Sequence, residues 1–224
     1  MDLSAADGTL TNDAPLPLHE RTMTTEELRS PTAEGMGEHG IALFETAIGR
    51  CGLAWSERGI AAVGFPDPEP ERTLARVRRS VPGATETKPP QRVALAIDAI
   101  KALLDGEATE LSSIELDFGA AGEFERRVYE AAREIPPGET LTYGELAARI
   151  GSPSEAREVG KALARNRVPI IVPCHRVVAA DGKLGGFSAR GGTKTKLRLL
   201  SIESRHGREP MTLFDPGPDP HEEI

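Results

Sequence analysis

The strongest constraint on the fold is a pair of helix-start signals separated by a glycine, within residues 142–165. The first signal is a capping box, T-x-x-E, which begins at Thr142 and opens a short helix. Gly151 can end that helix, and a second box, S-x-x-E, begins directly afterwards at Ser152. Pro153 suits the first helical position, where no backbone N–H is needed. Two short helices joined by a tight turn predict a helix-turn-helix, although any helical hairpin has a similar pattern.

The sequence on either side of this pair extends the prediction to a winged helix. Residues 124–135 carry apolar side chains at helical spacing and predict a preceding helix. Two apolar runs, 170–172 and 177–178, follow the pair, and Asp-Gly at 181–182 predicts a hairpin. A final helix is predicted over 193–203. A helix-turn-helix followed by a hairpin suggests a winged-helix domain.

A second unit is predicted between residues 41 and 118. Residues 41–65 contain short apolar runs broken by glycine, which indicate a β-hairpin or meander. Helical periodicity predicts helices at 72–80 and 92–106, and residues 109–118 are predicted as a further strand. The unit is therefore α+β, and it contains no residues that indicate chemistry.

Glycine and alanine between the two units mark a boundary between them. Together with a segment at each end, the two units divide the chain into four segments. We expect a disordered tail at 1–40, the α+β domain at 41–118, the winged-helix domain at 122–205 and an acidic tail at 206–224. Residues 1–40 have too few aliphatic side chains to offset the entropy of ordering them, and residues 206–224 are acidic and rich in proline. The fold class of the whole chain is therefore α+β.

The net charge of −8 hides a strong asymmetry along the chain. Residues 1–40 carry 2 basic and 8 acidic side chains, and residues 206–224 carry 1 and 5. Residues 121–205, by contrast, carry 15 basic and 10 acidic side chains. The total charge argues against phosphate binding. The basic segment, however, is equally consistent with a nucleic-acid partner and with a charged face exposed to solvent.

Composition also limits where the protein is expected to work. No apolar run approaches the roughly 20 residues needed to cross a bilayer, and the N-terminal sequence lacks the basic start and apolar stretch of a signal peptide. Two cysteines do not support a disulfide-stapled fold, so a reducing compartment is expected. We therefore expect a soluble, cytoplasmic protein without a membrane partner. Cys51, in an apolar hairpin, is expected to be a buried structural thiol.

The strongest candidate for chemistry is Cys174, within PIIVPCHRVV. A cysteine beside an apolar run is more often a core thiol, but its neighbours favour reactivity. His175 is the one histidine inside a segment expected to fold, and the preceding proline fixes the backbone. The cations Arg167, Arg176 and Lys183 favour the thiolate.

Other uses of this cysteine are less well supported. Cys174 and His175 give two metal ligands, and no second Cys/His pair completes a zinc tetrahedron, so no metal is expected. A cysteine hydrolase is an alternative, because a Cys-His pair can activate a nucleophile. Adjacent residues on a strand point to opposite faces, however, so direct contact between the two would need a turn.

Residues 170–178, IIVPCHRVV, resemble the active-site signature of the methylated-DNA–protein-cysteine methyltransferases, the O6-alkylguanine repair proteins. The resemblance extends over 124–203, including the helix-turn-helix pattern, and is weaker over 41–118, where it implies an RNase H-like fold. It implies irreversible, stoichiometric transfer of the alkyl group from O6-methylguanine, and also O4-methylthymine, to a cysteine, with base flipping. No cofactor is implied. The expected partner is double-stranded DNA containing O6-alkylguanine, bound by a monomer.

The same resemblance assigns five catalytic roles. Cys174 matches the alkyl acceptor, His175 the base that acts through a water, and Glu203 the acid that orients this histidine. Asn166 matches the asparagine that holds the segment before the cysteine. Tyr143 matches the tyrosine that crowds the flipped nucleotide and donates a proton as guanine leaves.

The resemblance also assigns residues that contact DNA. Arg157 matches the arginine finger that fills the space of the flipped base, and Ser188 matches a serine that helps recognise that base. Ala156 and Gly160 are small residues of the second helix, which suit close packing in a groove. Tyr143 belongs to this set as well.

Three positions depart from the family pattern. Glu158 follows the finger arginine where a small residue is common, Phe187 stands where some members carry tyrosine, and SARGG at 188–192 is longer than an S-G-G loop. Two other functions remain as alternatives. A damage-binding protein without chemistry typically has tryptophan in place of Cys174, and a sequence-specific regulator is disfavoured by the small residues of the second helix.

Overall fold

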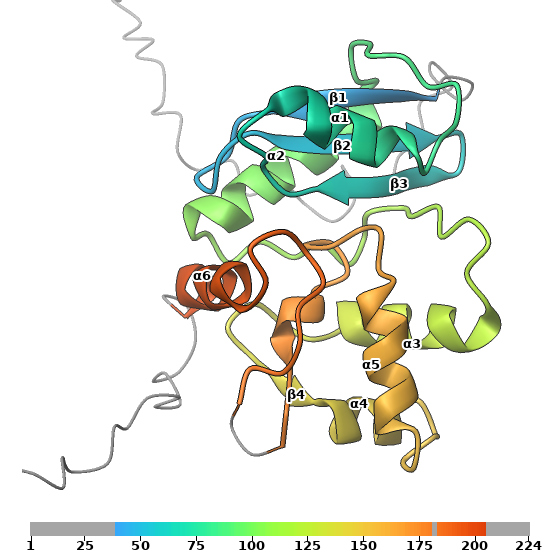
Figure 1. The fold of residues 1–224 in the computed structure, drawn as a ribbon, viewed down its shortest axis with the longest axis vertical. Helices are drawn as coiled ribbons and strands as arrows, with labels where there is room; N and C mark the ends of the chain where they lie inside the picture. Colours follow the sequence, from blue (N-terminus) through green and yellow to red (C-terminus); the bar gives the residue numbers. More distant parts are fainter. Residues whose placement is uncertain (1–38, 181–182, 205–224) are drawn as a thin grey trace, which may run out of the picture.

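The computed structural model describes residues 39–180 and 183–204, so the expected tails, apart from residues 39 and 40, and the Asp-Gly pair at 181–182 lie outside the described residues. The fold is a mixed α+β arrangement, as predicted (Figure 1). The first part of the chain forms β1 (Gly40–Phe44), β2 (Cys51–Ser56), β3 (Gly59–Gly64), α1 (Pro70–Arg78) and α2 (Gln91–Asp105). The second part forms α3 (Glu123–Arg133), β4 (Leu141–Thr142), α4 (Tyr143–Arg149), α5 (Ala156–Ala164), the 3-10 helix η1 (Cys174–Arg176), β5 (Val177–Val178) and α6 (Thr193–Glu203). Within the described residues no helix is both long enough and apolar enough to cross a membrane.

The three N-terminal strands form an antiparallel sheet in the order β1-β2-β3, which confirms the predicted meander. Both faces of the sheet are covered, because α1 and α2 lie on opposite sides of it (Figure 1). Leu53 and Trp55 belong to the core on the α2 side, whereas Ala54 between them packs with Val77 of α1. This alternation explains why β2 is apolar at nearly every position. Gly40 pairs with Trp55, so the first strand begins one residue before the expected boundary.

The predicted strand at 109–118 is wrong, although one bridge survives. Ile60 donates its N–H to Glu115 and accepts from Asp117, both at 2.9 Å, which forms an isolated parallel bridge to β3. The preceding residues turn instead of extending, because Leu111 and Ile114 are buried in the main core. The edge of β3 is therefore closed by a loop.

The helix-turn-helix pattern corresponds to α4 and α5, which contact each other and α3. The first capping box is confirmed: Glu145 N–H donates to Thr142 Oγ1 at 3.1 Å, and Thr142 N–H donates to the Glu145 carboxylate. The second is wrong, since α5 begins at Ala156 without a side-chain cap. Ser152 uses its backbone carbonyl to accept from Glu155 N–H, which closes a turn before the helix.

The apolar run at 170–172 forms a tight turn and not an extended strand. Ile170 has φ of +77°, a left-handed conformation that costs about 1–2 kcal/mol for a residue with a Cβ. Ile170 and Ile171 are each only 1% exposed, and burying such a side chain contributes about 1.5–3 kcal/mol. Burial therefore offsets the strain. The short strand β5 pairs in parallel with β4, and beyond it Ala179 N–H donates to the Lys183 carbonyl.

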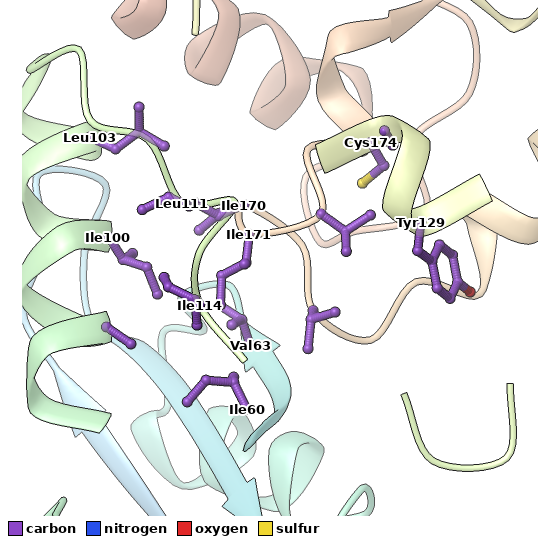
Figure 2. Close-up of a cluster of buried hydrophobic side chains, with 14 of the residues drawn as sticks. Ile60, Val63, Ile100, Leu103, Leu111, Ile114, Tyr129, Ile170, Ile171 and Cys174 are labelled. Atoms are coloured by element: carbon purple, nitrogen blue, oxygen red, sulfur yellow. The ribbon is translucent and has the colours of Figure 1, made fainter. Parts of the chain in front are cut away.

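One hydrophobic core runs through both parts of the chain. Figure 2 shows the isoleucines of the 170–171 turn lying against β3, α2 and the loop that carries Leu111 and Ile114. A backbone bond from Val63 N–H to the Arg167 carbonyl, at 2.9 Å, fixes the turn region to β3. The segment that leads to Cys174 is thus held by the N-terminal part of the protein.

Candidate active site

Cys174 is the first residue of a 3-10 turn, directly after the tight turn at 168–172. Asn166 bridges that tight turn: its Nδ2 donates to the Val172 carbonyl and its Oδ1 accepts from Val168 N–H, both at 2.9 Å. The N–H of Cys174 donates to the same Val172 carbonyl at 2.8 Å. Asn166 therefore lies where it can hold the segment before the cysteine, the position expected from the sequence.

Cys174 is a buried residue with an exposed fraction of only 9%, and this burial raises the pKa of its thiol. A hydrogen bond from Asn166, the charge of Lys196 and the backbone N–H groups of Cys174 and His175 act in the opposite direction. Arg176 was expected from the sequence to add positive potential at the thiol, but it is paired with Glu203 instead. The second cysteine, Cys51, is fully buried, and burial raises its pKa to about 11, as expected for a structural thiol.

Behind the cysteine, His175 and Glu203 form a buried pair. His175 Nε2 lies 2.9 Å from Glu203 Oε1, and neither residue is more than 3% exposed. Arg176 completes the cluster with two bonds to the same carboxylate, Nε to Oε2 at 2.9 Å and Nη2 to Oε1 at 2.8 Å. The third guanidinium nitrogen of Arg176, Nη1, donates to the Ile135 carbonyl. The 3-10 helix directs the His175 side chain toward Glu203 of α6. His175 therefore does not make the direct contact with Cys174 that a cysteine hydrolase needs.

The charge states in this cluster follow from its geometry. Although burial alone would raise it, the pKa of Glu203 is lowered to about 2 by His175 and Arg176. A carboxylate only accepts, so the proton on the His175 ring lies on Nε2. Burial lowers the pKa of His175, which favours the neutral ring. Its Nδ1 atom is buried and has no hydrogen-bond partner among the described residues, so this nitrogen is available to accept a proton.

Lys196 is a site residue that was not predicted from the sequence, although it lies in the predicted final helix. Its side chain is fully buried, its Nζ donates to the Val177 carbonyl at 2.6 Å, and it lies 5.9 Å from the centre of the Tyr143 ring. Burial lowers its pKa to about 8. The available signal was helical spacing, because Lys196, Leu199 and Glu203 are the buried residues of α6 and lie on one face.

Tyr143 lines a cavity of about 470 Å³ that reaches Cys174. Its ring packs beside Gly185, where φ is +68° and a Cβ would lie 3.0 Å from the ring, so glycine is required there. Burial raises the pKa of Tyr143, which keeps the phenol protonated. The cavity also contains the small residues and the arginine expected on the second helix; it is lined by Tyr143, Ala156, Arg157, Gly160, Leu163, Ala164, Cys174, Gly186, Phe187 and Ser188.

Arg157 and Glu158 occupy the exposed start of α5. Glu158 pairs with Lys161 at 2.7 Å, one turn along the helix, so its charge is partly compensated. Ser188 is exposed at the cavity rim and donates its hydroxyl to the Ala164 carbonyl at 2.9 Å. Among the described residues there is no cluster of three or more His, Cys, Asp or Glu suited to a metal ion.

Comparison with known proteins decides the family. A model described as the DNA-binding domain of 6-O-methylguanine DNA methyltransferase matches residues 123–205. A methylated-DNA–protein-cysteine methyltransferase of Mycolicibacterium paratuberculosis is 47% identical over 129 residues, which are 58% of this chain and 76% of that protein. The chain belongs to the methylated-DNA–protein-cysteine methyltransferase family. A member from Methanothermobacter thermautotrophicus is 37% identical over 152 residues, covering 68% of this chain and 78% of that one.

The structural comparison agrees with this family. The crystal structure of Mycobacterium tuberculosis OGT in complex with DNA is 34% identical, with a TM-score of 0.61, and the match covers 79% of this chain and 99% of that one. The region that the methyltransferase model matches, residues 123–205, contains every candidate site residue, from Tyr143 to Glu203.

Proposed function

We propose that this chain repairs double-stranded DNA containing O6-alkylguanine by transferring the alkyl group to Cys174. The observation that carries the proposal is the position of Cys174 between two features. On one side a cavity opens toward the exposed Arg157 of α5, and on the other lies the buried His175–Glu203 pair. An acceptor thiol needs both access to the base and a route for its proton.

The thiol proton is the first problem, because burial raises the pKa of Cys174. In the proposed mechanism the proton passes through a water to Nδ1 of His175. The charge that develops on the imidazole is stabilised by Glu203, which is ionised and 2.9 Å from Nε2. Lys196 supports the thiolate by its charge.

Alkyl transfer then forms a bond between the Cys174 sulfur and the alkyl carbon and breaks the bond from that carbon to guanine O6. The electron pair of the broken bond stays with the purine, and Tyr143 donates a proton as the guanine leaves. Its raised pKa suits a donor that must stay protonated until the transition state. The product is a thioether, which water does not readily attack, so each protein molecule acts once.

DNA binding is proposed at α4 and α5. The relative from M. tuberculosis was crystallised with DNA, and the small residues Ala156 and Gly160 leave α5 free to approach a groove. Arg157 would fill the stack after the base has rotated into the cavity. Ser188, on the cavity rim, is proposed to contact the flipped base once it has entered.

The finer expectations stand as part of this proposal. We propose a winged-helix domain at 122–205, an RNase H-like domain at 41–118, terminal tails at 1–40 and 206–224, and activity as a monomer. The requirement for a reduced thiol supports the cytoplasm as the compartment. O4-methylthymine is the second proposed substrate.

Stoichiometry tests the proposal. A fixed amount of protein is mixed with an excess of duplex containing one O6-methylguanine, and restored guanine is counted by nucleoside analysis at increasing times. We expect repair to stop at one guanine per protein molecule. Continued turnover, or loss of the lesion without restored guanine, would contradict the proposed chemistry.

A further inference from the structure

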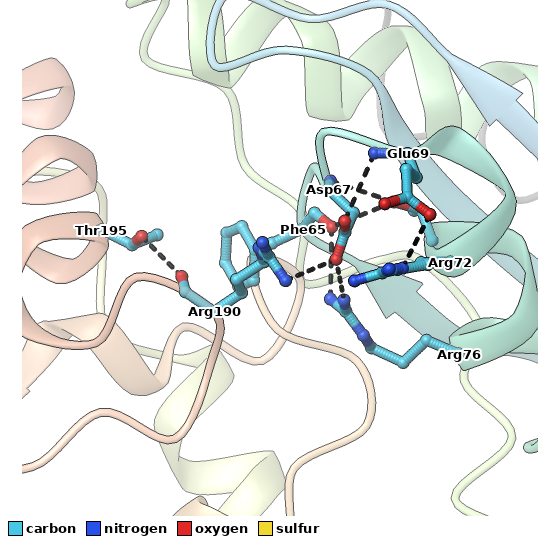
Figure 3. A network of polar contacts seen from close by, with 8 residues as sticks. Phe65, Asp67, Glu69, Arg72, Arg76, Arg190 and Thr195 are labelled. Atoms are coloured by element: carbon cyan, nitrogen blue, oxygen red, sulfur yellow. Dashed lines mark hydrogen bonds and ion pairs between the residues drawn. The ribbon is translucent and has the colours of Figure 1, made fainter.

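Outside the cluster at Cys174, a second buried charge links the two parts of the chain. Asp67, between β3 and α1, has a side chain that is 2% exposed. Its Oδ2 atom lies 3.2 Å from Nη2 of Arg76 in α1 and 2.6 Å from Nη1 of Arg190, which comes from the loop before α6 (Figure 3). Arg190 therefore reaches from the C-terminal part into the N-terminal part.

Asp67 is fixed on its own side of this contact. Its backbone N–H donates to Thr73 Oγ1 at 3.1 Å, and its Oδ1 accepts from Glu69 N–H at 3.3 Å. Arg76 adds a bond to the Phe65 carbonyl at 3.3 Å. These contacts within the N-terminal part hold the Asp67 carboxylate in place independently of Arg190.

On the other side, Arg190 belongs to the loop that borders the cavity at Cys174. Phe187 and Ser188 of this loop line that cavity. Phe187 meets Phe65 of the N-terminal part edge to face, with ring centres 6.0 Å apart. The Arg190 carbonyl accepts from Thr195 Oγ1 at 2.7 Å, which ties the end of the loop to α6 (Figure 3). This is the SARGG segment that the sequence shows to be longer than an S-G-G loop.

The same contact borders a second cavity of about 630 Å³, which reaches Cys174 from the side of the N-terminal part. Arg76, Arg190 and Ser188 are among its lining residues. Ser188 lines both cavities, so the loop at 186–190 lies between two open spaces. Phe187 and Ala189 pack against the core, and the ion pair of Arg190 with Asp67 anchors the C-terminal end of the loop.

We propose that Asp67 and Arg190 form a clamp by which the N-terminal part holds the loop at 186–190 in place over Cys174. In this role, which rests on the proposed function, Asp67 and Arg190 are positioning residues for alkyl transfer. They act through Phe187 and Ser188, because a reacting base that is held slightly out of place reacts much more slowly. The clamp should have little effect on DNA affinity, since α4 and α5 carry most of the proposed DNA contacts and Ser188 is proposed to meet the base only after it has flipped.

The test separates the rate of transfer from DNA affinity. Arg190→Ala and Asp67→Asn are compared with the unchanged protein in single-turnover reactions over a range of duplex concentrations. We expect the rate constant at saturation to fall about fivefold, the range of a well-formed ion pair with one exposed partner, while the half-saturating concentration stays within about twofold. Arg190→Lys, which keeps the charge, should recover most of the rate. The double variant should be no slower than the slower single one, because both substitutions remove the same interaction.

Arg198→Ala provides the matched control. Arg198 also joins the two parts, since its guanidinium donates to the carbonyls of Ala47 and Ile48 at 2.6 and 3.4 Å, but it does not touch the loop. We expect its rate constant to be unchanged. Equal losses in Arg198→Ala and Arg190→Ala, or no loss in Arg190→Ala, would overturn the clamp.

Hydrogen–deuterium exchange provides a readout that does not depend on the chemistry. Peptides covering 186–192 should exchange faster in Arg190→Ala than in the unchanged protein or in Arg198→Ala, with similar melting temperatures. Unchanged exchange would overturn the clamp even if repair is confirmed. If the unchanged protein transferred no methyl group, the proposed function would fail, and faster exchange in Arg190→Ala would still establish the clamp as a structural contact.

Discussion

The imidazole of His175 and the carboxylate of Glu203 face each other at 2.9 Å inside a buried cluster, with Arg176 on the same carboxylate. The pKa of Glu203 is about 2, below its ordinary value of 4.5. A carboxylate with a depressed pKa stabilises the fold above the unfolded value and loses that contribution as pH falls toward the folded value.

We therefore predict that Glu203→Gln lowers the free energy of unfolding by about 3 kcal/mol at pH 7, because it also leaves Arg176 buried without a charged partner. His175 also makes the fold less stable at low pH. Because its pKa is lowered in the folded state, the unfolded chain binds a proton more readily, and stability falls as the pH drops below about 6.5. Urea denaturation between pH 7 and pH 3 measures the effect. The two proteins should converge in stability as pH falls below about 4; a constant difference would argue against an ionised Glu203.

The positive charge of Lys196 near the cysteine leads to a second prediction. The charge of Lys196 lowers the pKa of the Cys174 thiol against the effect of burial. In Lys196→Met we expect the pH midpoint for alkylation of Cys174 by iodoacetamide to rise, and alkyl transfer at pH 7.5 to slow several-fold. Lys194→Met is the matched control, because Lys194 is an exposed lysine on the same helix. The same midpoint in all three proteins would show that Lys196 serves only to hold the Val177 carbonyl.

The helix α6 shows what the sequence could predict about the site. Its bounds, Thr193–Glu203, were predicted from periodicity, and Glu203 was placed by resemblance. Lys196 was not, because a charged residue on a short helix is usually on the surface. Only the shared spacing with Leu199 and Glu203 could have indicated that Lys196 is buried.

The errors in the fold have a related cause. The apolar run at 170–172 gave no sign of a tight turn, which depends on tertiary contacts: Asn166 bridges the turn, and Ile170 and Ile171 are buried in the core. The contact from Asp67 to Arg190 spans 123 positions in the sequence, and no local pattern predicts an interaction at that separation. The three antiparallel strands and the first capping box were predicted correctly because their determinants are local.

Arg157 is exposed at the start of α5 and lines the cavity, but it makes no contact with the buried His175–Glu203 cluster. We predict that Arg157→Ala slows repair in duplex DNA by at least tenfold and changes transfer from free O6-benzylguanine less than twofold, because only the duplex requires the base to leave the stack. Single-turnover rates with the two substrates give the comparison. Lys161→Ala, on the next turn of the helix, controls for loss of one positive charge. An equal loss with duplex and free base would rule out a role in base flipping.

The identity of the acceptor is the central claim, and intact-protein mass spectrometry tests it directly. After reaction with duplex DNA containing O6-methylguanine, we predict a gain of one methyl group per molecule, mapped by peptide analysis to Cys174. Cys51→Ala should gain the same methyl group, because Cys51 is fully buried and its pKa is raised to about 11, whereas Cys174→Ala should gain none. Methylation at another residue, or an unchanged mass together with repaired DNA, would contradict the account.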